Sequence, residues 1–239
     1  MRLELDPLGC DGNRVPVNVD GVAAFSLWST RLDWICAGEP LRVQILAAEA
    51  LPLPESEPSE PAPGAIARIA ASLAGTRAVA ILHHPGRTFS PERIAFAEGA
   101  RIFALGDEAD ERCWDAMLTR GVPVWGLRGK AVCTVDRADE RSVIGALIYG
   151  NFHAEDGLSL DRIEETRTGV SWTCARDDAQ AEVIARGGFP ISRQAGASGR
   201  WTDRGDEGYV RISTRAGDSV AFTQPRFIAP SARPVPHAH

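Results

Sequence analysis

The stretch between residues 64 and 150 constrains the fold most, because short apolar runs alternate there with segments of helical periodicity. Runs of strand length occupy 78–82 (AVAIL), 101–105 (RIFAL), 122–127 (VPVWGL) and 131–135 (AVCTV). The segments between them place apolar residues three or four positions apart, the spacing of a helix with one buried face. This alternation predicts parallel strands, and therefore an α/β layer or barrel.

The same stretch indicates where the helices begin and end. Apolar spacing predicts helices around 66–73, 91–97, 114–118 and 143–148. Ser90 and Pro91 form a good N-cap and first-turn pair for the second of these helices. Glycines that can end a helix follow the other three, at Gly75, Gly121 and Gly150.

The pattern changes after about residue 155, where strand-like alternation is broken by glycine turns. We therefore expect a barrel-like domain over 1–155 and a small antiparallel β subdomain over 156–228. Five prolines among acidic residues at 52–63 predict an exposed loop within the first domain. Residues 229–239 are expected to form a disordered tail.

Composition narrows the partners and the location. The formal net charge of −6 argues against a nucleic-acid or anionic-membrane partner. No apolar stretch approaches the roughly 20 residues of a membrane helix, and no signal peptide is recognisable, so we expect a cytoplasmic protein. The five cysteines are widely spaced without a CxxC pair, which predicts reduced, mostly buried thiols.

Three segments in the later part of the chain carry specific motifs: WDAMLTRGVPVWGL at 114–127, GALIYGNFHAEDG at 145–157 and DEGYVRISTRAGDSVAFTQPRFI at 206–228. In order and spacing they are similar to the closing segments of the PHP (polymerase and histidinol phosphatase) family, which the chain therefore resembles. Upstream, AILHHPGR at 80–87 resembles the family's strand-end His-Pro. The resemblance implies a distorted (β/α)7 barrel with two or three metal ions at its C-terminal strand ends and phosphate-ester hydrolysis. The matching residues are Trp114, Asp115, Trp125, Gly126, Ala146, Leu147, Gly150, Phe152, Gly157, Tyr209, Val210, Arg211, Thr223, Gln224 and Pro225.

Four residues fall where the family has metal ligands and could still bind a metal. Glu4 and Asp6 replace the two histidines of the first family motif, Glu49 fits the bridging glutamate, and His84 fits the strand-end histidine. Carboxylates and imidazole can hold a single Mn, Zn or Fe ion. The alternatives are an acidic strand start for Glu4 and Asp6 and a local hydrogen bond for His84.

Elsewhere the resemblance implies that the ligands are lost. The Asp and His of the second motif fall on Leu27 and Trp28, whose side chains cannot ligate. The Asp and His of the last motif are also missing, and Arg128 and Lys130 bring positive charge to that place, which disfavours cations. A multinuclear site is therefore not expected.

The leading hypothesis is a degenerate, non-catalytic member that binds an anionic small molecule or a protein partner and needs no metal. Arg87, Arg128 and Lys130, beside His84, would form an anion pocket; alternatively they are solvated charges paired with nearby acidic residues. The runner-up is a metal-dependent phosphoesterase with a single metal ion at Glu4, Asp6, Glu49 and His84. An unrelated hydrolase using the barrel mouth is a third possibility, so the sequence leaves open whether the chain is an enzyme. It does not indicate an oligomeric state.

Overall fold

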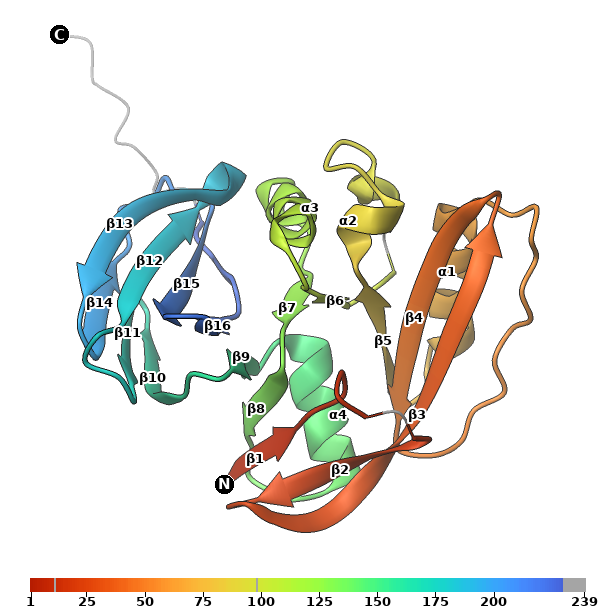
Figure 1. The fold of residues 1–239 in the computed structure, drawn as a ribbon, viewed down its shortest axis with the longest axis horizontal. Coiled ribbons are helices and arrows are strands. Elements are labelled where there is room, and N and C mark those ends of the chain that lie inside the picture. Colours follow the sequence, from red (N-terminus) through yellow and green to blue (C-terminus); the bar gives the residue numbers. More distant parts are fainter. Residues whose placement is uncertain (11, 98, 230–239) are drawn as a thin grey trace, which may run out of the picture.

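The fold is dominated by one large mixed β-sheet (Figure 1). It was described with a computed structural model that covers residues 1–10, 12–97 and 99–229. The strand order is β13-β12-β15-β16-β9-β8-β1-β2-β3-β4-β5-β6-β7, with β17 paired to β15. The expected (β/α)7 barrel is wrong: over the described strands this path does not close, and parallel pairing joins β5 to β6 and β6 to β7, whereas the other strand pairs are antiparallel.

The N-terminal strands form an antiparallel meander that local patterns did not predict. The strands are β1 (Arg2–Leu5), β2 (Arg14–Val19), β3 (Val22–Cys36) and β4 (Glu39–Ala47). Two-residue turns join β2 to β3 at Asp20-Gly21 and β3 to β4 at Ala37-Gly38, and all four residues have positive φ. Turns of this kind match the twist of paired antiparallel strands, so each pair folds as a hairpin.

The middle of the chain supplies the parallel strands and most of the helices. The strands expected at 78–82, 101–105 and 122–127 are confirmed as β5 (Ala78–His83), β6 (Ile102–Ala104) and β7 (Trp125–Leu127). The helix expected at 91–97 is shorter than predicted, a 3-10 turn, η1. The helices of this region are α1 (Ala62–Leu73), α2 (Pro85–Thr88), η1 (Ile94–Ala97) and α3 (Glu108–Thr119).

The next strand shows why the barrel expectation failed. β8 (Lys130–Thr134) lies where a strand was expected, but it pairs antiparallel with β1 and with β9 (Phe152–Asp156). An apolar run predicts a strand without indicating its partner. Between them, α4 (Glu140–Tyr149) ends as expected at Gly150, whose φ is 73° and whose added Cβ would lie 2.6 Å from the Trp125 ring.

The C-terminal strands continue the large sheet, because β9 pairs with β16. These strands are β12 (Gln180–Ala185), β13 (Phe189–Ala195), β15 (Tyr209–Ala216), β16 (Ser219–Thr223) and β17 (Arg226–Phe227), with the 3-10 turn η2 (Arg186–Gly188). A separate three-stranded sheet packs beside them, formed by β10 (Leu160–Thr166), β11 (Gly169–Cys174) and β14 (Ser198–Thr202). Residues 230–239 of the expected tail lie outside the described residues.

Two hydrophobic cores support this arrangement. The larger core unites α1, α3 and α4 with strands β1 to β9, and the smaller one lies among the C-terminal strands. Residues between β4 and α1 include the proline-rich segment and form neither helix nor strand. Within the described residues, no helix is long and apolar enough to cross a membrane.

A buried ion pair fastens α3 to the C-terminal part of the sheet. Arg211 of β15 is 2% exposed and donates to both carboxylate oxygens of Asp115 in α3, over 3.0 and 2.8 Å. The Tyr209 hydroxyl donates to the same carboxylate over 2.7 Å. The Arg211 guanidinium also lies 4.5 Å from the centre of the Trp114 ring. Asp115 is therefore shared by the two parts of the fold.

Candidate functional site

The carboxyl ends of β5, β6 and β7 meet at one edge of the sheet, where they line a pocket of about 410 Å³. Parallel strands commonly bind ligands at this edge, because the loops that follow the strands converge there. We call this the strand-end pocket. Its lining residues are Leu8, Arg31, Arg42, His83, His84, Ala104, Leu105, Gly106, Arg128, Gly129 and Asp156.

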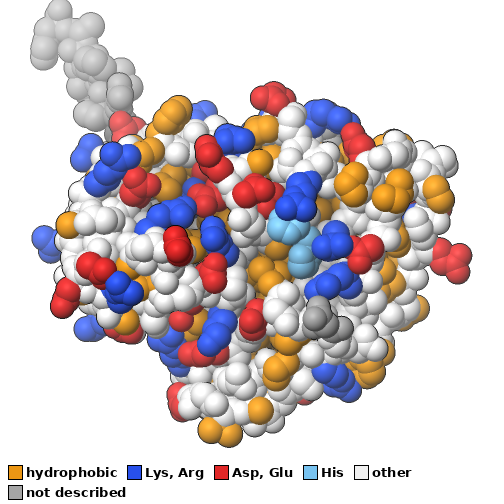
Figure 2. Space-filling view, viewed as in Figure 1, with side chains coloured by type: hydrophobic (Ala, Val, Ile, Leu, Met, Phe, Trp, Pro, Cys, Tyr) orange, Lys and Arg blue, Asp and Glu red, His pale blue; other side chains and the backbone are white. Residues whose placement is uncertain are grey.

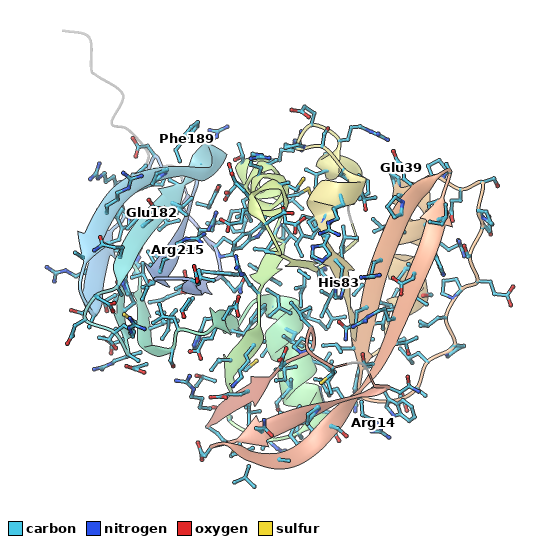
Figure 3. All side chains as sticks on the ribbon, in the orientation of Figure 1. Arg14, Glu39, His83, Glu182, Phe189 and Arg215 are labelled. Atoms are coloured by element: carbon cyan, nitrogen blue, oxygen red, sulfur yellow. The ribbon has the colours of Figure 1, made fainter. Side chains whose placement is uncertain are left out.

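A second hollow of about 280 Å³ adjoins it and shares Arg42, His83 and His84. We call it the side groove; it is lined further by Trp34 of β3 and Arg87 of α2. Figure 3 labels His83 at the end of β5, beside the β3–β4 hairpin. In Figure 2, exposed histidine side chains lie near the middle of this face with Lys and Arg side chains beside them.

The strand-end pocket is cationic although the chain is acidic. Three arginines, Arg31, Arg42 and Arg128, line it together with one carboxylate, Asp156, among the described lining residues. The whole chain carries a formal charge of −6, so the sign of the charge is reversed locally. Arg128 Nε donates to Asp156 Oδ2 over 2.9 Å, and Arg42 Nε donates to Asp33 at the rim of the side groove.

His84 is held in place by a buried carboxylate. Its Nδ1 lies 3.2 Å from Oδ2 of Asp110, a residue of α3 that is 0% exposed. Asp110 also accepts hydrogen bonds from the backbone N–H groups of Gly86 and Gly106, each over 2.8 Å. Because the carboxylate is the acceptor, the Nδ1 proton of His84 points to Asp110, and in the neutral imidazole the lone pair is then on Nε2.

The backbone around His84 keeps this geometry fixed. His84 has φ 47° and ψ 58°, a left-handed conformation that costs a non-glycine residue on the order of 1 kcal/mol. A Cβ added to Gly106 would lie 2.6 Å from Cε1 of His84, so the ring can lie against β6 only because residue 106 is glycine. Such strain is commonly concentrated at functional sites.

His83 forms part of the pocket floor and is neutral. Its Nε2 lies 3.1 Å from Oε1 of Gln44, while the Gln44 amide donates to the Pro7 carbonyl and to the Ser29 hydroxyl. Gln44 Oε1 is therefore the acceptor, and His83 Nε2 carries the proton. Burial, together with the nearby charge of Arg31, lowers the pKa of His83 to about 4.

The residues that sequence indicated as an anion pocket separate into two groups. Arg128 and His84 line the strand-end pocket, and Arg87 lies in the side groove, which His84 also lines. Lys130 lies outside both hollows: its side chain is 55% exposed, and its ammonium is 3.7 Å from Glu4. For Lys130, this contact agrees with the alternative that these charges are solvated and paired with nearby acidic residues.

The four candidate metal ligands are not brought together. Asp6 accepts a hydrogen bond from the Gly9 N–H, and Glu4 lies 3.5 Å from Arg2. Glu49 follows the end of β4, where Ala47 pairs with Ala78, whereas His84 follows the opposite end of β5. A six-residue strand separates these ends by roughly 16 Å. Over the described part of the chain, no cluster of three or more His, Cys, Asp or Glu could hold a metal ion.

Sequence reasoning missed Arg31, Arg42 and Asp110. One signal was present for the arginines: polar residues alternate along the β3–β4 hairpin at Ser29, Arg31 and Asp33, and again at Arg42 and Gln44. Such alternation is typical of a strand with one polar face. Asp110 offered no signal, because an acidic residue in the first turn of a helix is ordinary.

Comparison with known proteins identifies no family for the chain. No protein-family model matches the sequence, and no curated protein matches it. Among solved structures, the chain is similar to a two-domain protein from Bacteroides vulgatus that contains a predicted PHP-like metal-dependent phosphoesterase. That similarity has 11% sequence identity and a TM-score of 0.36, and covers 81% of this chain and 70% of the other. A likeness this weak establishes neither the fold nor the chemistry of the present chain.

Proposed function

We propose that this protein binds a small anionic ligand, such as a phosphorylated compound, in the strand-end pocket. One observation carries the proposal: Arg31, Arg42 and Arg128, from three different strands or strand ends, line one hollow beside His84. Guanidinium groups bind phosphate and carboxylate oxygens through charge and paired hydrogen bonds.

The dimensions of the site favour a small molecule over a macromolecular partner. Small-molecule sites occupy roughly 300–1,000 Å³. The strand-end pocket, at about 410 Å³, lies within this range, and the side groove, at about 280 Å³, lies just below it. The acidic chain would repel an extended polyanion, whereas a small anion meets mainly the local cationic charge.

The ion pairs of Arg42 and Arg128 leave part of each guanidinium available to a ligand. Arg42 and Arg128 contact Asp33 and Asp156 through Nε. A guanidinium carries further N–H groups on its two Nη atoms, and these can bind a ligand while Nε stays paired. The two acids then fix the arginine side chains and lower the entropy that ligand binding would otherwise cost.

The proposal rests on the pocket, and it does not need the resemblance to the PHP family. That resemblance implies a barrel, whereas the described strands form an open sheet. The alternative of a single metal ion at Glu4, Asp6, Glu49 and His84 has no geometric support, because those side chains lie apart.

Inorganic phosphate is the first probe of this site, by isothermal titration calorimetry and thermal unfolding. We expect saturable binding that raises the melting temperature. Arg128→Ala removes charged hydrogen bonds worth about 1.5–3 kcal/mol and should weaken binding about 10- to 150-fold. Lys130→Ala is the matched control, because Lys130 pairs with Glu4 outside the pocket. Equal weakening by both variants, or no saturable binding by the wild type, would contradict the proposal.

A further inference from the structure

We propose that the strand-end pocket is a phosphoryl-transfer site in which Nε2 of His84 is the nucleophile and forms a phosphohistidine intermediate. This inference rests on the proposed anion-binding function and adds a reaction to it. It depends on three features of the described residues: the orientation of the His84 ring, the charges around it, and the proton donors of the pocket.

The His84 ring is oriented as a nucleophile must be. Asp110 accepts from Nδ1 over 3.2 Å, so the neutral ring has its lone pair on Nε2. The Asp110 carboxylate is fully buried, whereas 33% of the His84 side chain is exposed and lines both hollows. A buried carboxylate behind an imidazole fixes its tautomer and stabilises the positive charge that develops when Nε2 forms a bond.

The cations around His84 match the charge of a transferring phosphoryl group. Its three non-bridging oxygens carry most of the negative charge, and catalysis depends on positioning and electrostatic stabilisation of that charge. Arg31, Arg42 and Arg128 line the same pocket as His84, and Arg87 lines the adjoining groove. A phosphoryl group bound at His84 would therefore share the pocket with these cations.

The proton donors of the pocket indicate the substrate class. The carboxylate of Asp156 is engaged by Arg128 and serves as an acceptor. His83 is neutral, and its Nε2 proton is committed to Gln44. Because neither of these two described lining residues is placed to protonate an alkoxide, we expect a leaving group that departs as a stable anion. This requirement selects acyl phosphates, phosphoanhydrides and aryl phosphates over alkyl phosphomonoesters.

The reaction balances with these groups and water. The Nε2 lone pair forms an N–P bond as the P–O bond to the leaving group breaks, and that group departs with the bonding electron pair. The Nδ1 proton stays on the imidazole ring, whose positive charge Asp110 offsets. Water then attacks phosphorus, and the N–P electron pair returns to Nε2. Inorganic phosphate leaves with the oxygen of the attacking water, and the proton released from that water passes to phosphate or solvent.

The experiment uses the full chain with acetyl phosphate and, separately, p-nitrophenyl phosphate. We expect an intact-mass increase of one phosphoryl group that is labile in acid and stable in base, and peptide mapping should place it on His84. His84→Asn should abolish the adduct and turnover, and asparagine tolerates the left-handed backbone of this position. His153→Gln is the matched control, because His153 is also bound to a carboxylate, Glu155, but lies outside both hollows.

The outcomes separate this inference from the binding proposal. Saturable phosphate binding without an adduct, or an adduct that maps to another residue, overturns the nucleophile and leaves the binding proposal standing. Turnover that persists in His84→Asn also overturns the role of His84 as nucleophile and leaves the binding proposal standing. Mapping of the wild-type adduct decides the matter even if His84→Asn fails to fold. Absence of phosphate binding by the wild type would overturn both proposals.

Discussion

Replacing Asp115 with alanine should destabilise the protein strongly, because it removes the carboxylate that accepts two hydrogen bonds from the buried Arg211. The guanidinium then keeps Glu111, 3.7 Å away, as a more distant acidic neighbour. The Arg211 side chain is 2% exposed, and both of its hydrogen bonds to Asp115 are within 3.0 Å. Removing one member of a buried ion pair costs about 3–5 kcal/mol. The Tyr209 hydroxyl loses its acceptor as well, at about 1 kcal/mol. Since such terms do not add fully, we expect a loss of about 4 kcal/mol in the free energy of unfolding.

Urea unfolding followed by circular dichroism and tryptophan fluorescence measures this loss. With an m-value of about 2–3 kcal/mol/M, the midpoint should fall by about 1.3–2 M. Tyr209→Phe is a graded control that removes the hydrogen bond to Asp115 and the one that the hydroxyl accepts from the Gly188 N–H, and it should cost about 1–2 kcal/mol. The double variant Asp115→Leu/Arg211→Met should be more stable than Asp115→Ala, because it leaves no buried charge unpaired. A loss below 1 kcal/mol in Asp115→Ala would refute the reasoning.

Two further predictions concern the histidines of the pocket. Gly106→Ala should push the His84 ring away from Asp110, which should lower the free energy of unfolding by about 1–3 kcal/mol and slow His84 phosphorylation at least tenfold. Gly145→Ala is the control and should have neither effect, because a Cβ added there meets nothing within 4 Å. Folding lowers the pKa of His83 from 6.5 to about 4, so the unfolded chain takes up its proton first as the pH falls, and the stability of the wild type should decline between pH 6.5 and 4. Between pH 7 and 4.5, the free energy of unfolding of His83→Gln, measured by urea titration, should fall by about 2–3 kcal/mol less than that of the wild type. Equal decreases in the two proteins would show that His83 does not titrate in this way.

Sequence reasoning succeeded where a local pattern determines the structure. The helix before Gly150 and the run at 78–82 were predicted correctly, since burial periodicity and a glycine stop are local properties. The run at 131–135 was recognised as a strand, but its antiparallel partners β1 and β9 are set by packing across the sheet. The barrel expected from the alternation and from the PHP resemblance therefore failed at β8 and in the antiparallel meander of β1 to β4.

The candidate site divides in the same way. His84 and Arg128 were singled out from the sequence because each follows an apolar strand and falls at a motif position of the PHP resemblance. Arg42 reaches the pocket through a hairpin whose register aligns it with His83. Asp110 reaches His84 from 26 residues away through the packing of α3. Neither contact follows from a sequence pattern, because each depends on how separate elements pack.

The hydrogen bonds that Asp110 accepts also have a consequence for how this protein could evolve. One carboxylate holds the His84 ring and the N–H groups of Gly86 and Gly106, so four positions from three segments share a single set of hydrogen bonds. A change at any one of them removes much of the selective reason to keep the others. Relatives should therefore either keep both the His-Pro-Gly motif and the glycine and aspartate that lie four residues apart, or lack both.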